Sequence, residues 1–256
     1  MHSESEPKKT IRLLLRDSCE ALNRGKLTYL GLPSDTAQDL KVLEPFLENV
    51  ICIGNVKTEL DEAARVVARM PIKSKRFLLR EMWKYLSAEY PSEPLVSDVT
   101  FLDFYGGGVC SSDPFADEVG GLRAFFAKNA RQQNKCFILA WTYNPRDMGK
   151  QVYVEIGKEL FTNDELNILE RTAGFAARSF AIRALLKKSL TEHKMHGKVV
   201  QHAVYKRVMG AIIIVFCKGK DPNCACELQD PKMFLEEPIV EYAERQLIPR
   251  FIPLPT

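Results

Sequence analysis

Short apolar runs alternate with amphipathic stretches along most of this chain. Runs such as "LTYLGL", "NVICIGN" and "CFILAWTYN" are rich in β-branched and aromatic residues, which favour strands. Between the runs, apolar residues recur at the three-to-four spacing of an amphipathic helix, as in "TELDEAARVVARM". Strands separated by helices pair in parallel through right-handed crossovers. The pattern therefore predicts an α/β fold, with a mostly parallel sheet covered by helices on both faces.

The same pattern gives bounds for each expected element. Helices are expected over 11–25, 35–47, 58–70, from about 82, over 121–131 and over 163–190. Strands are expected over 27–32, 49–55, 75–79, 97–103, 136–144, 198–207 and 211–219. Thr58 is the expected N-cap of its helix. A two-residue turn at Met209-Gly210 joins the last two strands, so these two form a C-terminal antiparallel hairpin.

Length and composition predict one main domain. With 256 residues, 46% of them hydrophobic, the chain can bury a full core. We expect an N-terminal tail and helix over 1–25, a Rossmann-like domain over 26–218 and a C-terminal extension packed on it over 219–256. The start, "MHSESEPKKT", is polar, and no uncharged apolar run reaches the roughly 18 residues of a membrane span. A cytoplasmic protein without a membrane contact is the expectation.

The cysteines predict neither disulfides nor a metal centre. Seven cysteines, an odd number, are scattered along the chain, several of them within apolar runs where a reduced cysteine packs as a small hydrophobic residue. Cys224 and Cys226 could supply two metal ligands, but no second pair stands at a suitable spacing.

Basic residues are concentrated in two stretches, although the net charge is only +3. Residues 65–84 contain seven Lys and Arg against one acid, and residues 171–207 contain nine against one. Such stretches are either solvated helix faces or a footprint for phosphates. We expect RNA or DNA as a partner through these two stretches and leave the oligomeric state open.

Ligands of open α/β sheets bind beyond the carboxyl ends of the strands. The first such loop is Gly31-Leu32-Pro33-Ser34, where glycine permits close backbone approach and the following helix offers unpaired amides. A plain strand-to-helix turn is the alternative. Gly54-Asn55 follow the second strand and Glu81 follows the third. These seven positions are the candidate ligand-binding residues of the first three loops.

The most informative loop is "DFYGGG", directly after the strand "VTFL". Asp103 offers a hydrogen-bond acceptor, Phe104 and Tyr105 offer stacking surfaces, and Gly106 begins a flexible run of glycines. Together they could hold a planar amine, whereas the alternative is a glycine-rich turn after a core strand. After the fifth strand, Thr142, Asn144 and Arg146 are candidates to line the substrate side.

The order of elements and the "DFYGGG" loop resemble class I S-adenosylmethionine-dependent methyltransferases. In that family five β-α units are followed by an antiparallel hairpin, which implies a seven-stranded sheet here. Asp103-Phe104-Tyr105-Gly106 resembles the Asp/Asn-Pro-Pro-aromatic motif of amino-group methyltransferases, and more closely the Asp-Pro-aromatic-Gly version of tRNA guanine N2-methyltransferases. Three features depart from the family: fewer glycines after the first strand, Gly54-Asn55 in place of the ribose-binding acid, and Phe104 in place of a proline.

The resemblance implies methyl transfer from S-adenosylmethionine to an amine of a nucleic acid base. It assigns the catalytic role to Asp103 and Tyr105, and substrate contacts to Phe104, Gly106, Thr142, Asn144 and Arg146. The cofactor would contact Gly31, Leu32, Pro33, Ser34, Gly54, Asn55 and Glu81. A second hypothesis, a catalytically inactive Rossmann-like binding protein, accounts for the missing glycines and acid. A nicotinamide-dependent oxidoreductase is a third, but it needs a glycine fingerprint that this chain lacks.

Overall fold

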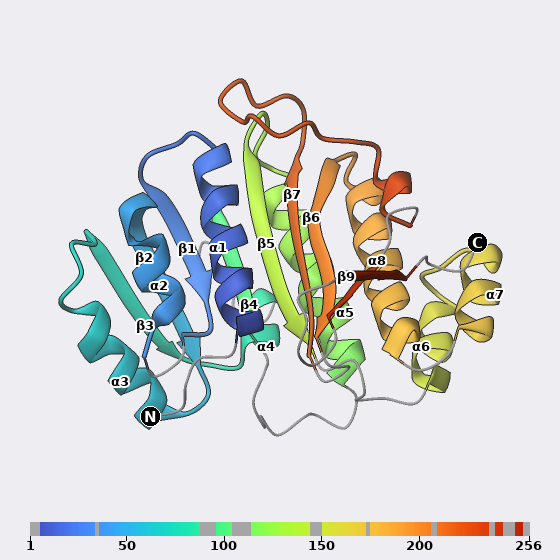
Figure 1. Cartoon of the computed structure of the whole chain (residues 1–256), viewed down its shortest axis with the longest axis horizontal. Helices are drawn as coiled ribbons and strands as arrows, with labels where there is room; N and C mark the ends of the chain where they lie inside the picture. The colour runs from blue at the N-terminus through green and yellow to red at the C-terminus, as the bar shows by residue number, and fades with distance from the viewer. Residues whose placement is uncertain are drawn as a thin grey trace.

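The computed structural model contains one nine-stranded sheet, in the order β3-β2-β1-β4-β5-β7-β6-β8-β9 (Figure 1). It describes residues 6–33, 36–87, 96–103, 114–143, 150–172, 175–205, 209–235, 239–242 and 249–252. The first five strands are parallel: β1 (Leu27–Gly31), β2 (Leu47–Gly54), β3 (Ser74–Leu79), β4 (Val99–Asp103) and β5 (Cys136–Tyr143). The remaining strands are β6 (His196–Tyr205), β7 (Met209–Cys217), β8 (Ile239–Tyr242) and β9 (Pro249–Ile252).

The predicted fold class is confirmed. β6 and β7 form the expected antiparallel hairpin, and β7 pairs with β5, so the first seven strands have the expected arrangement. The predicted number of seven strands is too low, because β8 and β9 extend the same sheet beyond β6. The division of the chain at 26, 218 and 219 remains a prediction.

Helices cover both faces of the sheet and enclose two apolar layers (Figure 1). One face is covered by α1 (Glu6–Ala21), α2 (Gln38–Leu43) and α3 (Lys57–Val67), with the short 3-10 helix η1 (Glu44–Phe46) leading into β2. The other is covered by α4 (Met82–Leu86), α5 (Pro114–Asn129), α6 (Lys150–Gly157), α7 (Asn163–Arg171) and α8 (Phe175–Glu192). A second 3-10 helix, η2 (Pro231–Leu235), packs beside α8. Side chains alternate between the layers along each strand, as the period of a β-strand requires.

Several predicted boundaries are wrong, each because tertiary contacts outweigh local pattern. The expected helix 35–47 ends early, since Leu47 pairs with Leu27 as the first residue of β2. Met209 and Gly210 are not a turn but the start of β7, opposite Tyr205 and Val204. The helix expected over 163–190 is two helices, α7 and α8.

Two further local differences concern helix starts. Thr58 lies inside α3, whose N-cap position is Val56. Thr162, by contrast, caps α7 through a reciprocal capping box with Glu165, a cap that was not predicted. Within the described part of the chain, no helix combines the length and the apolar character needed to cross a membrane.

Candidate active site at the carboxyl edge of the sheet

Three of the predicted site loops leave the sheet at one edge. β1 pairs in parallel with β2 on one side and with β4 on the other, so their carboxyl ends lie together. Gly31 is in register with Phe101, two residues before Asp103. The first loop and the "DFYGGG" loop therefore begin at neighbouring points of the same edge, as the sequence analysis expected.

Asp103 is anchored at this edge through both of its carboxylate oxygens. Its Oδ1 accepts a hydrogen bond of 2.7 Å from the hydroxyl of Thr142, which lies opposite it on β5. Its Oδ2 accepts one of 2.9 Å from Nζ of Lys8, on α1. The Asp103 side chain is 11% exposed. A partly buried carboxylate held at both oxygens has a fixed position, and Lys8 marks where an N–H donor approaches it.

The space beside Gly31 is filled by the chain itself. Tyr29 lies two positions earlier on the same face of β1, and a Cβ added to Gly31 would overlap its phenol ring. The phenol of Tyr29 donates a hydrogen bond to Oδ2 of Asp39, on α2. Both side chains are buried, Tyr29 completely and Asp39 to within 2%. Gly31 is thus required by its own strand neighbour, and its α1-facing side is closed to a ligand.

Burial dominates the protonation behaviour of this pair. It raises the pKa of Tyr29 well above its ordinary value, and the nearby charge of Asp39 raises it further. Burial also raises the pKa of Asp39, against the lowering effects of the Tyr29 hydrogen bond and of the Arg12 guanidinium. Asp103 adds to the rise in both cases. Two carboxylates therefore share this edge, and α1 places Lys8 and Arg12 against them.

The other described candidates are less constrained. The amide of Leu32 donates to the carbonyl of Phe101 over 3.3 Å, so the strand-like backbone continues one residue past Gly31, and Pro33 follows it, partly exposed. The carbonyl of Gly54 accepts from the amide of Arg80.

Two polar candidates lie on the surface. Asn55 is exposed directly after β2. Glu81 is exposed and forms a 3.0 Å ion pair with Lys84, its neighbour on α4. Among the contacts that the structure records, no side chain holds Asn55 or Glu81 at the carboxyl edge of the sheet.

Six predicted site residues lie outside the described residues, so their roles remain predictions. They are Ser34, Phe104, Tyr105, Gly106, Asn144 and Arg146. Conversely, Lys8, Arg12, Tyr29 and Asp39 were not predicted as site residues. Lys8 falls in a polar tail, Tyr29 in an apolar strand and Asp39 at a helix start, so their local sequence carries no signal for this edge.

The two basic stretches differ in how far their side chains are buried. Arg178 and Arg183, from the stretch 171–207, are buried to 3% and 0%. Arg178 forms a 2.7 Å ion pair with Glu118, and Arg183 donates to Nδ1 of His202 and to the carbonyl of Phe234, both over 2.6 Å. These two arginines stabilise the core between helices and sheet, which corrects the expectation that this stretch as a whole faces a nucleic acid.

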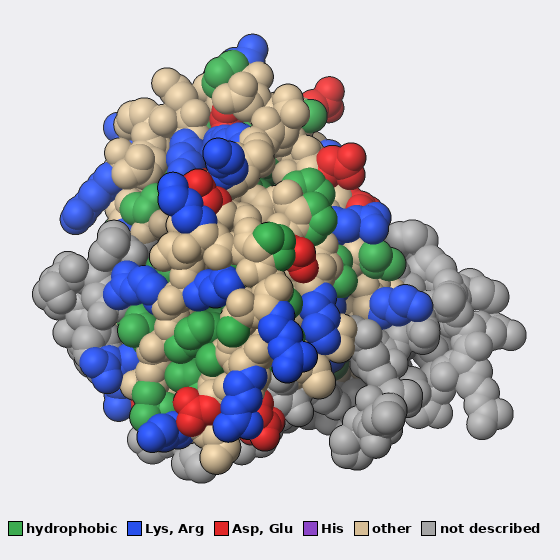
Figure 2. Space-filling model, turned by 90° about the vertical axis from the view of Figure 1, so that its left-hand side faces the viewer, with side chains coloured by type: hydrophobic (Ala, Val, Ile, Leu, Met, Phe, Trp, Pro, Cys, Tyr) green, Lys and Arg blue, Asp and Glu red, His purple; other side chains and the backbone are tan. Residues whose placement is uncertain are grey.

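The stretch 65–84 is instead on the surface. β3 is an edge strand of the sheet, and Figure 2 shows Lys and Arg side chains spread over this side of the molecule. Five of its seven basic residues are exposed and two are partly exposed: Arg65, Arg69, Lys73, Arg80 and Lys84, then Lys75 and Arg76. We call these seven residues the basic face.

Comparisons with known proteins give similarity to solved structures at low sequence identity. No model of a protein family matches, and no curated protein matches either. Among solved structures, a putative methyltransferase from Streptococcus mutans in complex with SAH has a TM-score of 0.48 and 12% identity, covering 84% of this chain and 99% of its own. An O-methyltransferase from Bacillus cereus in complex with SAH has a TM-score of 0.48 and 12% identity, covering 85% and 83%. An rRNA methylase from Streptococcus thermophilus has a TM-score of 0.43 and 9% identity, covering 86% and 99%.

The sheet by itself defines the class of fold. Five parallel strands followed by an antiparallel hairpin, with β7 inserted between β5 and β6, is the arrangement that the resemblance to class I methyltransferases implied. Such a fold supports many functions, so the site must decide the activity. The described residues fit S-adenosylmethionine in part: the ends of β2 and β4 and the backbone after Gly31 lie at the edge where it would bind, whereas Tyr29 and Asp39 occupy the α1 side.

Proposed function

We propose that this protein is an S-adenosylmethionine-dependent methyltransferase whose reaction site lies where β1 and β4 end side by side. The observation behind the proposal is the position of Asp103, a carboxylate fixed at the carboxyl end of β4, two residues beyond Phe101, which is in register with Gly31 at the end of β1. In an open α/β sheet this is where a bound ligand meets the catalytic side chains. S-adenosylmethionine would supply the methyl group. It would be held by Leu32, Pro33, Gly54, Asn55 and Glu81.

The proposed acceptor is an amine. A carboxylate accepts hydrogen bonds from N–H groups, and Lys8 already places an ammonium nitrogen 2.9 Å from Oδ2 of Asp103. A substrate amine would take the place of this ammonium group, while the Thr142 hydroxyl keeps the carboxylate oriented through Oδ1. Positioning an amine and removing its water contributes to the rate without any covalent intermediate on the protein.

The proposed substrate class is a nucleic acid. The basic face lies on and around β3, whose carboxyl end at Leu79 is in register with Gly54 at the same edge. Lys and Arg side chains contact phosphates without regard to sequence and would hold the backbone near the site. A base must leave its stack to reach Asp103, and the predicted roles of Phe104 and Tyr105 are to stack against it.

Methyl transfer tests the activity directly. The purified chain is incubated with S-adenosylmethionine labelled in its methyl group and with total RNA, genomic DNA or a protein lysate. We expect incorporation into a nucleic acid fraction, lost on Asp103→Ala and retained by Asp61→Asn, which changes an exposed acid on α3. Equal incorporation by the Asp103→Ala variant and the wild type would show that Asp103 has no role in the reaction. Label in the protein fraction alone would show that nucleic acid is not the substrate.

A catalytically inactive binding protein is the second candidate, and two contacts favour it. The Tyr29 and Asp39 pair fills the space beside Gly31, and Lys8 occupies one oxygen of Asp103. Calorimetry with S-adenosylmethionine and S-adenosylhomocysteine separates the two candidates. Binding of either compound supports the methyltransferase, and absence of binding at millimolar cofactor supports the inactive protein.

A further inference from the structure

Four of the seven cysteines meet at the amino edge of the sheet, opposite the candidate active site. Cys136 is the first residue of β5, and it pairs in register with Cys217, the last residue of β7. Cys224 and Cys226 lie in the segment that follows β7 and pack against the same apolar layer. Cys224 and Cys226 have no second pair of cysteines near them in the sequence. The fold brings Cys136 and Cys217 to the same edge as this second pair.

The four cysteines lie close together. Cys136 and Cys217 face each other across β5 and β7, and the Asp221 carboxylate accepts from the amide of Cys136 and from the amide of Asn223, the residue before Cys224. Cys136 and Cys217 are buried, whereas Cys224 and Cys226 are partly exposed. Small reagents from solvent therefore meet Cys224 or Cys226 first, with Cys136 directly behind them.

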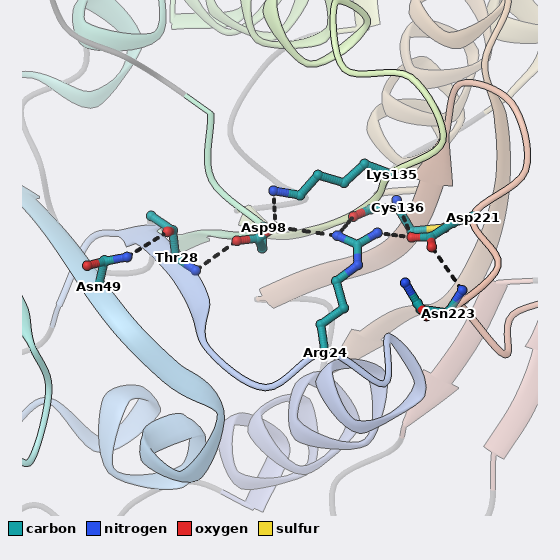
Figure 3. Close-up of polar contacts among 8 residues, drawn as sticks. All are labelled: Arg24, Thr28, Asn49, Asp98, Lys135, Cys136, Asp221 and Asn223. Carbon is teal, nitrogen blue, oxygen red and sulfur yellow. Dashed lines mark hydrogen bonds and ion pairs between the residues drawn. The ribbon is translucent and has the colours of Figure 1, made fainter.

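Asp221 and α1 fix the segment that holds Cys224. The carboxylate of Asp221 accepts hydrogen bonds from the amides of Cys136 (2.9 Å) and Asn223 (3.0 Å), and it forms an ion pair with Arg24 (Figure 3). Arg24 also donates to the carbonyl of Cys136 over 3.2 Å. The amide of Cys224 donates to the carbonyl of Asp221, and the amide of Ala225 donates to the carbonyl of Ala21 at the end of α1. Cys224 is therefore held against Cys136 by contacts on both sides.

The electrostatic setting favours a thiolate at Cys224. Hydrogen bonds from Cys136 and Cys226, with a further contribution from Arg24, lower the pKa of Cys224 to about 3. The pKa of Cys136 is raised by its hydrogen bonds with Cys217 and Cys224, and the pKa of Cys226 is raised by its hydrogen bond with Cys224. A thiolate is the reactive form of cysteine, so the cluster pairs a nucleophile with a protonated thiol.

A metal centre is the other use for clustered cysteines. In the part of the chain that the structure describes, however, no three His, Cys, Asp or Glu side chains are arranged to hold a metal ion. Thiols paired by hydrogen bonds instead match the arrangement of oxidant-sensitive cysteines, in which a second cysteine stands beside the reactive one.

We propose that Cys224 is an oxidant-sensitive cysteine that forms a disulfide with Cys136 when the protein meets hydrogen peroxide. The Cys224 thiolate attacks the peroxide oxygen, the O–O bond breaks, and hydroxide leaves and takes up a proton, which gives a sulfenic acid and water. The Cys136 thiol then attacks the Cys224 sulfur, the S–O bond breaks and a second water leaves. Two thiols are oxidised and one peroxide is reduced, so atoms and electrons balance.

The test uses the full chain with Cys110→Ser as background, because Cys110 lies outside the described residues. Protein reduced and freed of reductant is treated with hydrogen peroxide, the remaining thiols are alkylated, and peptides are identified by mass spectrometry. We expect a peptide containing Cys136 linked to one containing Cys224. Cys224→Ser should abolish this product, and Cys136→Ser should leave a sulfenic acid at Cys224 that a 1,3-diketone traps.

Cys19→Ala is the matched control, because Cys19 is buried in α1 and burial raises its pKa to about 12. This variant should form the 136–224 link at the wild-type rate. The proposal is overturned if no linked peptide forms, if Cys224 links to Cys226 instead, or if Cys19 is oxidised as fast as Cys224. Stoichiometric zinc in the reduced protein, with thiols that react only after chelation, would also overturn it in favour of a metal centre. Wild-type protein alone decides these outcomes even if a variant fails to fold.

Discussion

At the scale of single residues, the end of β1 is determined by a contact within one strand. In the sequence, Gly31 resembles a glycine that lets a ligand approach the backbone. A Cβ at this position, however, would collide with the ring of Tyr29, two residues earlier. The phenol ring in turn is held by Asp39. A small residue beside a buried aromatic ring is a packing requirement, since protein interiors leave few voids.

Gly31→Ala should therefore destabilise the protein, by about 1–3 kcal/mol, the usual cost of overpacking a core. Urea denaturation measures the change. In a Tyr29→Val background the added methyl group meets no ring, so the cost of Gly31→Ala should fall, as coupled neighbours do in a double-mutant cycle. An equal cost in both backgrounds would mean that another contact, and not Tyr29, demands the glycine.

Asp39 should make stability depend on pH. Because its pKa is raised above the ordinary value of 3.8, the folded state binds this proton more tightly than the unfolded chain does. The contribution of the group is thus present at low pH and is lost as the pH rises above 3.8 through the folded value. Asp39→Asn keeps a hydrogen-bond acceptor for Tyr29 without the charge. Its stability relative to the wild type should improve between about pH 4 and about pH 7, as followed by thermal denaturation.

The control for this pH dependence is Asp61→Asn, since Asp61 is an exposed acid on α3. Its stability difference from the wild type should change less over the same interval. A constant difference between Asp39→Asn and the wild type at all pH values would contradict the buried, proton-binding state of Asp39.

At the scale of elements, a buried ion pair ties two helices together on the face away from α1. Arg178 on α8 and Glu118 on α5 are both nearly inaccessible to solvent and lie 2.7 Å apart. The Arg178 guanidinium also lies over the ring of Tyr143, 5.6 Å from its centroid, at the carboxyl end of β5. Two helices and a strand next to the candidate site therefore depend on one pair of charges.

Glu118→Gln should cost about 3–5 kcal/mol, because it leaves the Arg178 charge buried without its partner. The double variant Glu118→Leu with Arg178→Met replaces both charges with apolar side chains, so it should recover most of the loss. Chemical denaturation of the three proteins measures both effects. A double variant as unstable as the single one would mean that the pair contributes through other hydrogen bonds, such as that from Arg178 to Tyr153.

Some helices and strands were predictable from the sequence pattern, and others were not. The strands at 27–31, 99–103 and 136–143 and the carboxyl-end position of Asp103 were predictable, because apolar runs and helix periodicity act locally. The break between α7 and α8 was not, since apolar residues continue across it at helical spacing. The contact of Lys8 was not predictable for a different reason: its partner Asp103 is 95 residues away in the sequence.

At the scale of the whole molecule, α1 runs across the sheet between two edges with different chemistry (Figure 1). Near its start, Lys8 contacts Asp103 at the carboxyl edge, and at its end Ala21 contacts the cysteine-bearing segment at the amino edge. Positive charge on the surface is also divided unevenly, with the basic face around β3.

If nucleic acid binds at the basic face, replacing Arg65, Arg69 and Lys73 with Gln should weaken binding and make it less sensitive to salt. Each lost phosphate contact reduces the slope of log K against log salt by about 0.9 for duplex DNA. Fluorescence anisotropy at several salt concentrations measures the slope. The matched control removes the same charge from Arg171, Lys188 and Lys194 in the second stretch, of which Arg171 and Lys194 are exposed and Lys188 is partly exposed. Equal losses in both triple variants would indicate attraction by net charge instead of a defined face.

The local pattern of the chain was enough to predict the class of fold and the candidate carboxylate. Alternating apolar runs and amphipathic helices indicate a parallel sheet, and the loops after parallel strands gather at one edge, so the position of Asp103 at that edge was predictable. The surroundings of Asp103 follow from the three-dimensional arrangement alone: the ammonium of Lys8 and the ring that fills the space at Gly31. The same holds for Cys136 and Cys217, which meet at the opposite edge of the sheet. These contacts join residues far apart in the chain, and long-range packing of side chains leaves no trace in the local period of a sequence.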